Sequence, residues 1–119
     1  MTGELTTHVL DTARGMPGVG MRVDLVAIGP AGERRELVAA TTNAEGRTDA
    51  PLLAGAAMKC GRYELWFHVA AYFRASGITL AEPPFLDIVP VRFAIGDRAA
   101  HYHIPLLFSP WSYTTYRGG

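Results

Sequence analysis

Imidazole is the side chain that normally changes charge near neutral pH, so the four histidines are the first candidates for acid–base chemistry. Two of them lie in the run His101-Tyr102-His103. Residues two apart on a β-strand point to the same face, so on a strand both rings would share one side of a sheet. Such a pair could bind a metal ion or divide acid and base duties. It could equally consist of surface or hydrogen-bonded histidines, and the pair by itself leaves these alternatives open.

His8 and Arg47 are further candidates, although each has an ordinary structural interpretation. His8 lies in the run 5–11, whose other residues are mostly small or apolar, and a lone histidine in such a strand is more often structural than catalytic. Arg47 lies at a turn, where an arginine is usually solvated. His68 has no evident partner and is taken as structural.

The carboxyl end of the chain carries more aromatic mass than a frayed tail usually does. Trp111, Tyr113 and Tyr116 favour a docked final strand, and Arg117 brings a permanent cation close to the terminus. Other catalytic signatures are missing: the sequence has no glycine-rich phosphate loop, no Gly-x-Ser-x-Gly motif and no Cys/His cluster with zinc spacing. Cys60, beside a lysine, could be an activated thiol, but no supporting constellation accompanies it.

Composition and charge narrow the classes to which the protein can belong. Its 119 residues predict a single domain, spanning residues 1–119, that can bury a core without disulfides. With 11 basic and 11 acidic side chains the net charge is zero, so the basic stripe of a nucleic-acid binder is missing. No signal peptide is visible, and no apolar run approaches the length of a bilayer span. We therefore expect a cytoplasmic protein that binds neither nucleic acid nor membrane.

Strand-like segments recur along the chain, separated by turns rich in glycine, proline and asparagine. Apolar and polar side chains alternate most clearly over residues 21–28 and 62–69. The alternation then breaks, and a short helix is predicted near residues 70–76. The other strands are expected near residues 5–11, 35–42, 47–51, 85–95, 100–108 and 111–117, with Pro90 arguing for an edge position or a bulge. About eight short strands predict an all-β domain, an antiparallel sandwich or barrel.

Four segments taken together resemble the signatures of the 5-hydroxyisourate hydrolases. Their order and spacing hold from residue 5 to the terminus, so the resemblance covers nearly the whole chain. Each motif alone would be a weak signal, whereas four in register are a strong one. The segments are LTTHVLDT at residues 5–12 with GMPG at 15–18, TNAEGR at 42–47, HYHIPLLFSP at 101–110 and YTTYRG at 113–118.

This family is homologous to transthyretin, the hormone carrier. The resemblance therefore implies a transthyretin-like, two-sheet antiparallel β-sandwich with four strands in each sheet. Subunits of the family pair edge to edge into dimers, and two dimers stack into a homotetramer with a central channel. The active sites would lie at the dimer–dimer interface, and neither a cofactor nor a metal is implied.

The resemblance also implies a set of site residues. The catalytic residues would be His8, Arg47 and His101. The substrate would be bound by His8, Arg47, Tyr116, Arg117 and Gly118, with His103 in a supporting role. The carrier branch replaces the histidines and the terminal motif, so their presence favours the enzyme. Gly119 stands where the family usually has a serine, which removes one hydroxyl near the site, and we expect activity to persist.

The implied reaction is hydrolysis of 5-hydroxyisourate to 2-oxo-4-hydroxy-4-carboxy-5-ureidoimidazoline in urate degradation. A water molecule must lose a proton as it attacks a ring carbonyl, and neutral imidazole is suited to accepting that proton. We hypothesise that His8 and His101 position and deprotonate the water, without assigning the proton to either, while Arg47 stabilises the oxyanion. The alternatives are a transthyretin-like carrier without catalysis, a metal site at His101 and His103, and a structural module.

Overall fold

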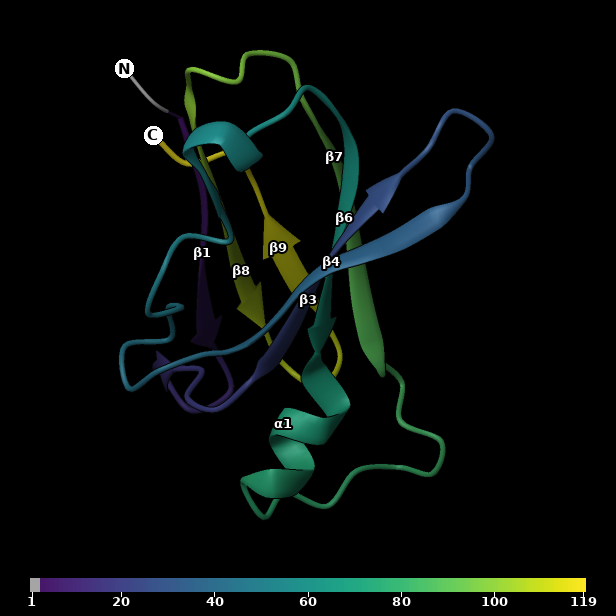
Figure 1. The fold of residues 1–119 in the computed structure, drawn as a ribbon. Helices are drawn as coiled ribbons and strands as arrows, with labels where there is room; N and C mark the ends of the chain where they lie inside the picture. The colour runs from purple at the N-terminus through teal and green to yellow at the C-terminus, as the bar shows by residue number, and fades with distance from the viewer. Residues whose placement is uncertain (1–2) are drawn as a thin grey trace.

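Two β-sheets packed face to face make up the protein, with a short helix at one end (Figure 1). The structure is a computed structural model and describes residues 3–119. In chain order the elements are β1 (Glu4–Asp11), β2 (Met16–Pro17), β3 (Arg22–Ile28), β4 (Arg34–Thr41), β5 (Leu53–Ala54), the 3₁₀ turn η1 (Gly55–Ala57), β6 (Gly61–His68), α1 (Val69–Ala75), β7 (Ile88–Ile95), β8 (His101–Phe108) and β9 (Tyr113–Thr115). The predicted all-β sandwich and its short helix are confirmed. No helix within residues 3–119 is long and apolar enough to cross a membrane.

The strand order shows how the two halves of the chain are interleaved. One sheet has the strand order β2-β1-β8-β9, and the other has the order β4-β3-β6-β7. In the first sheet β5 also pairs with β1, so this sheet has five strands and not the expected four. Neighbouring strands run antiparallel except β1 and β8, which are parallel. Parallel neighbours need a long connection, and here the entire second sheet is formed between β1 and β8 in the sequence.

The core lies between the sheets because the strands bury alternate residues. Leu5, Val9 and Leu106 of the first sheet are 0% exposed, as are Leu25 and Phe67 of the second. Burying each such side chain contributes about 1.5–3 kcal/mol. The even-numbered residues of β1 are only half-buried and lie on the opposite, outer face.

Some expected strand boundaries are wrong. The strand predicted over residues 47–51 does not form: Arg47 makes only an isolated bridge to His8, and pairing resumes at β5. The final strand is shorter than residues 111–117, although Gly118 makes a further bridge to His103. β7 begins at Ile88, after the predicted start of its strand at residue 85. A strand ends where its hydrogen bonds to the neighbouring strand end. Side-chain alternation within one segment does not show where that point lies.

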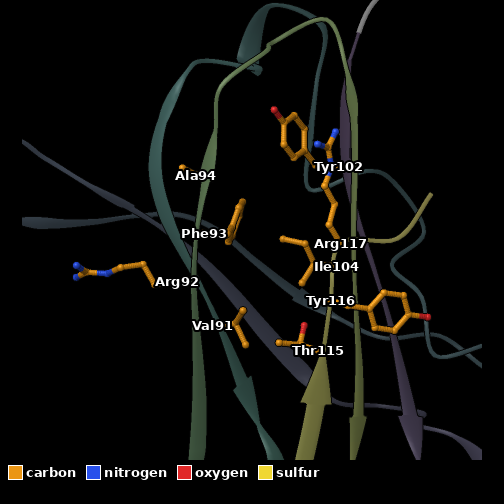
Figure 2. A pocket seen from close by; sticks show the side chains of 9 residues that line it. All are labelled: Val91, Arg92, Phe93, Ala94, Tyr102, Ile104, Thr115, Tyr116 and Arg117. Carbon is orange, nitrogen blue, oxygen red and sulfur yellow. The ribbon is translucent and has the colours of Figure 1, made fainter.

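The sandwich is open along one side, where β7 and β9 are the edge strands of the two sheets. A cavity of about 370 Å³ lies there, and Figure 2 shows Val91 and Phe93 of β7 facing Ile104 and Thr115 across it. Pro90 also lies on β7, at the edge position that its missing N–H predicts. Because edge strands present backbone groups without strand partners, β7 and β9 are available for pairing with another chain.

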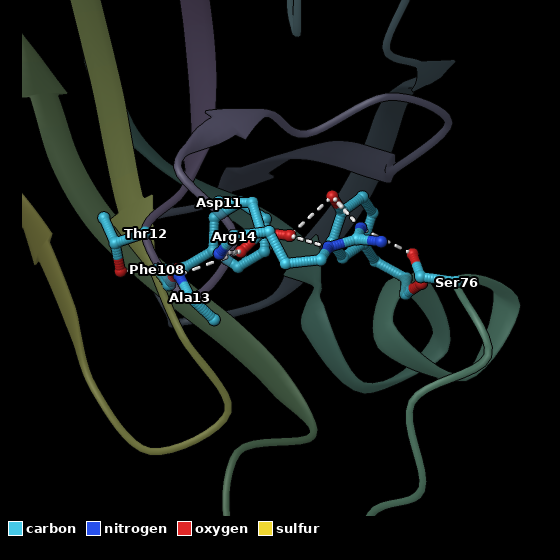
Figure 3. A network of polar contacts seen from close by, with 7 residues as sticks. Asp11, Thr12, Ala13, Arg14, Ser76 and Phe108 are labelled. Atoms are coloured by element: carbon cyan, nitrogen blue, oxygen red, sulfur yellow. Dashed lines mark hydrogen bonds and ion pairs between the residues drawn. The ribbon is translucent and has the colours of Figure 1, made fainter.

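A buried polar network ties α1 to β1 (Figure 3). The Asp11 side chain is 0% exposed and accepts hydrogen bonds from the Arg14 guanidinium at 2.8 Å and the Tyr72 hydroxyl at 2.9 Å. Arg14 also donates to the hydroxyls of Tyr72 and Ser76. Burial alone would raise the pKa of Asp11, but the hydrogen bonds from Arg14 and Tyr72 outweigh it and hold this pKa below its usual value.

We expect Asp11→Ala to lower the free energy of unfolding by about 2–4 kcal/mol, because the buried Tyr72 hydroxyl loses its charged acceptor and the partly exposed Arg14 loses its ion-pair partner. Urea unfolding at a fixed protein concentration measures the change. Asp87→Ala is the matched control: Asp87 is exposed, so its replacement should change stability by about 0.5 kcal/mol or less. Equal losses in the two variants would contradict a structural role for the network.

A second charged cluster lies on the outer face of the other sheet and makes stability depend on pH. Glu64 is 9% exposed at its side chain and lies 3.2 Å from both Arg34 and Arg92. Hydrogen bonds from Arg34 and then Trp66 lower the pKa of Glu64 to about 2, from 4.5 for an unperturbed glutamate. Because the folded-state pKa is the lower one, Glu64 stabilises the fold above the unfolded pKa, and this contribution is lost as the pH falls towards 2.

Wild-type protein is therefore expected to lose more thermal stability between about pH 6 and pH 3 than Glu64→Gln does, because the variant has no carboxylate to protonate at this position. Thermal unfolding followed by circular dichroism at the two pH values measures the difference. Parallel losses of melting temperature in the two proteins would show that Glu64 does not contribute to the acid sensitivity.

Candidate active site

The predicted site histidines lie together on the outer face of the sheet formed by β1 and β8. The parallel register pairs Thr6 with His103 and Glu4 with His101, so His101 and His103 lie beside the outward-facing residues of β1. On β8 the intervening Tyr102 is buried, as the alternation predicted. The structure thus brings two runs almost one hundred residues apart in sequence onto one surface.

Arg47 reaches this surface from a tight turn between β4 and β5. The Asn43 side-chain oxygen accepts hydrogen bonds from the backbone N–H groups of Glu45 and Arg47, at 2.9 and 3.2 Å. Gly46 has a φ of 77°, which favours glycine, and an added Cβ there would lie 2.5 Å from the carbonyl oxygen of Val9. The backbone of the turn therefore packs directly against β1. Among residues 3–119 the exposed Arg47 guanidinium has no hydrogen-bond or ion-pair partner, so its donors are free for a ligand.

His8 is attached to the same turn. Its backbone makes an antiparallel bridge with Arg47, and its Nε2 lies 2.9 Å from the carbonyl oxygen of Glu45. A carbonyl oxygen only accepts hydrogen bonds, so Nε2 of His8 carries a proton and donates it. In the neutral ring, Nδ1 is then the nitrogen with a free lone pair. His8 is half-buried, which leaves it partly open to a ligand.

His101 and His103 share a hydroxyl that the sequence did not single out. The Thr6 Oγ1 lies 3.0 Å from Nε2 of His101 and 2.8 Å from Nδ1 of His103. The two rings are 6.4 Å apart, centroid to centroid. The signal for Thr6 was present in its spacing, since it precedes His8 by two residues on the same strand face.

The carboxyl-terminal motif meets the histidines through its backbone. The Gly118 N–H donates to the His103 carbonyl over 2.6 Å. The Arg117 guanidinium donates to the His101 carbonyl at 3.3 Å and lies 4.1 Å above the Tyr102 ring. Tyr116 is 57% exposed and adjoins the cavity at the open edge, where Figure 2 shows its ring turned away from Val91 and Phe93. Within residues 3–119 no hydrogen bond joins the side chains of Tyr116 and Arg117 to an imidazole ring, and neither residue lines the cavity beside His101 and His103.

A cavity of about 350 Å³ opens beside the two imidazoles of β8. Arg47, His101 and His103 contribute to its lining, together with Thr6 and the terminal Gly119. His8 lies next to it through its bridge to Arg47. The terminal position at which the family's serine is missing thus adjoins this cavity.

Burial and nearby positive charge favour the neutral form of the His103 imidazole. Burial lowers the pKa of His103, and the nearby Arg47, His101 and His8 lower it further. His103 is half-buried whereas His101 is exposed. A neutral imidazole beside a permanent cation can accept a proton from water while the cation stabilises developing negative charge, which is the requirement for hydrolysis of an acyl group.

A metal site at His101 and His103 was the alternative that the sequence left open. Over residues 3–119 no group of three or more histidine, cysteine or carboxylate side chains is placed to hold a metal ion. His101 and His103 are two imidazoles facing one hydroxyl, and one nitrogen of each is already within hydrogen-bond distance of it.

Gly118 is expected to be indispensable for the position of His103. A Cβ added there would lie 2.7 Å from Cδ2 of His103, so Gly118→Ala should displace that ring and lower kcat/KM by about tenfold or more, as small displacements of reacting groups do. A Cβ at Gly119 would have nothing within 4 Å, so Gly119→Ala should change kcat/KM by about threefold or less. Steady-state kinetics of the two variants tests this, and equal effects would contradict it.

The fold and the site together define a transthyretin-like β-sandwich that carries a histidine–arginine cluster on one sheet. The HIUase/Transthyretin family matches residues 5–118 of the chain. The chain belongs to this family, as its four motifs indicated.

Individual relatives agree with this assignment. The chain is 54% identical over 114 residues to the 5-hydroxyisourate hydrolase of Deinococcus radiodurans, a match that covers 96% of this chain and 94% of that protein. A crystal structure of (S)-allantoin synthase matches with a TM-score of 0.93 and 42% identity over 99% of this chain, which spans only 44% of that longer one. Sea bream transthyretin in complex with thyroxine matches with a TM-score of 0.86 and 27% identity, over 97% of this chain and 94% of that one.

Proposed function

We propose that this protein is a hydrolase that converts 5-hydroxyisourate to 2-oxo-4-hydroxy-4-carboxy-5-ureidoimidazoline, a step of urate degradation. The bond broken is a cyclic amide C–N bond: the ring carbonyl carbon becomes the carboxylate and the ring nitrogen becomes part of the ureido group. The observation that carries the proposal is the gathering of His8, His101, His103 and Arg47 around one surface cavity. The identity of 54% to the Deinococcus radiodurans hydrolase supports it.

In the mechanism that this arrangement favours, a neutral imidazole accepts a proton from water as the water oxygen attacks the ring carbonyl. Arg47 binds the carbonyl oxygen and stabilises the oxyanion, since its guanidinium is always charged and has free donors in the described part of the chain. The tetrahedral intermediate then collapses, the C–N bond breaks, and the imidazolium returns its proton to the leaving nitrogen. We assign catalytic roles to His8, Arg47 and His101, and the lowered pKa of His103 makes its neutral ring a candidate for the base itself.

We further propose that the protein acts as a homotetramer without a cofactor, in the cytoplasm. The open edges of β7 and β9 are suited to pairing between subunits, because their outer backbone groups have no strand partner within residues 3–119. A second dimer over the outer face of β1 and β8 would close the histidine cavity and exclude water from it. We propose that Tyr116, Arg117 and Gly118 bind substrate in this tetramer. The exposed Tyr116 side chain would then make contacts across the subunit interface.

The decisive test follows the absorbance of freshly generated 5-hydroxyisourate with wild-type protein, with His101→Ala and without protein. We expect fast decay with the wild type and decay close to the uncatalysed rate with the variant. Size-exclusion chromatography on both proteins controls for assembly. Uncatalysed decay with correctly assembled wild-type protein would overturn the proposed hydrolase.

A carrier without catalysis is the second candidate function. It is favoured by the structural match to sea bream transthyretin, which was solved in complex with thyroxine. A carrier would bind a small molecule saturably and leave the decay rate of 5-hydroxyisourate unchanged. Calorimetric titration with thyroxine alongside the decay assay separates the two functions.

A further inference from the structure

Thr6 occupies the centre of the imidazole pair and has no other polar side-chain contact within residues 3–119. Its position is set by the register of two strands, since Thr6 pairs with His103 across β1 and β8. Both hydrogen-bond distances, 3.0 Å to His101 and 2.8 Å to His103, are in the range of direct contacts. Threonine is stiff at χ1, so the hydroxyl is held in place by its own strand.

A hydroxyl carries a single proton, which restricts how Thr6 can serve both rings. It can donate to at most one imidazole nitrogen, so at least one of the two rings must donate an N–H to it. If it donates to Nε2 of His101, it must accept from Nδ1–H of His103. In that arrangement Nε2 of His103 has the free lone pair, and no residue in the described part of the chain forms a hydrogen bond with it.

We propose that Thr6 is a positioning residue that connects His101 and His103 in a proton relay, an inference that rests on the hydrolase function proposed above. Water loses a proton to Nε2 of His103, breaking an O–H bond and forming an N–H bond. The proton on Nδ1 of His103 passes to Oγ1 of Thr6, and the Thr6 hydroxyl proton passes to Nε2 of His101. The positive charge is then on His101, while His103 remains neutral and Thr6 is unchanged.

The surroundings of the two rings favour this direction. His103 is half-buried, and Arg47 opposes a positive charge on it. His101 is exposed, so water can solvate its charged form. The other ionisable groups around the pair are Glu4, opposite His101 on β1, and Asp49, His8 and Arg117 from neighbouring segments.

The kinetic test compares Thr6→Val, which keeps the β-branched shape and removes the hydroxyl, with Thr6→Ser, which retains it. We expect Thr6→Val to lower kcat by about 10–10²-fold, a part of what general base catalysis contributes, with KM changed by about threefold or less and a shifted pH profile of kcat. Thr6→Ser should recover most of kcat. Thr41→Val, on an exposed position of the other sheet, is the matched control and should retain wild-type kinetics. Wild-type kcat in Thr6→Val, or failure of Thr6→Ser to recover, would overturn the relay.

A measurement without substrate separates the relay from the proposed function. Nitrogen-15 NMR of the imidazoles in the assembled protein should show Nδ1–H as the preferred tautomer of His103, and Thr6→Val should abolish that preference. Unchanged imidazole spectra in Thr6→Val overturn the relay, whatever the kinetics. If wild-type protein does not hydrolyse 5-hydroxyisourate, the proposed function fails, and the spectra still decide whether Thr6 couples the two rings.

Discussion

Replacing Arg47 with alanine is expected to lower kcat/KM for 5-hydroxyisourate by about 10²–10³-fold, the usual loss when a donor to a developing oxyanion is removed. The guanidinium is exposed beside the imidazole cavity and has no partner within residues 3–119, so its loss should leave the fold intact. Arg47→Lys should recover only part of the activity, because an ammonium retains the charge and loses the planar pair of donors.

Steady-state kinetics with thermal unfolding of the same samples measures both consequences. Arg35→Ala is the control, because Arg35 is an exposed arginine on β4 of the other sheet. It should change kcat/KM by about threefold or less. An Arg47→Ala protein that keeps near-native kcat/KM would remove Arg47 from the mechanism.

The second large effect is expected at the imidazoles. His103→Ala should lower kcat by about 10²–10⁴-fold, the range for a lost general base, and His8→Ala and His101→Ala should each cost about 10²-fold or more. The geometry ranks His103 first, because it is the more enclosed of the β8 pair and because burial, Arg47 and the other imidazoles lower its pKa.

His68→Ala is the control for removing an imidazole elsewhere. His68 lies on β6 and its Nε2 is 2.8 Å from Oδ2 of Asp24, the partner that the sequence did not reveal. Its replacement should reduce stability and leave kcat close to wild type. Measuring kcat and the melting temperature for all four histidine variants separates a loss of catalysis from a loss of stability. A His103→Ala variant with wild-type kcat would disprove the assignment of His103 as the base.

Local patterns predicted most of the elements because side-chain alternation is a property of single strands. Strands β3 and β6 fall on the predicted runs, and α1 spans Val69–Ala75 against a prediction of residues 70–76. The same patterns failed at residues 47–51, where Arg47 meets β1 only at an isolated bridge. A strand exists only where another backbone accepts its hydrogen bonds, and composition does not contain that information.

The sequence by itself determined the family through four ordered motifs, and it placed His101 and His103 on one strand face, because residues two apart on a strand must share a side. Only the tertiary structure decided which chemical groups meet. The parallel pairing of β1 with β8 brings Thr6 between the two imidazoles, and the turn at Gly46 carries Arg47 to His8. These contacts join segments distant in the chain, so they depend on register and packing rather than on any local pattern.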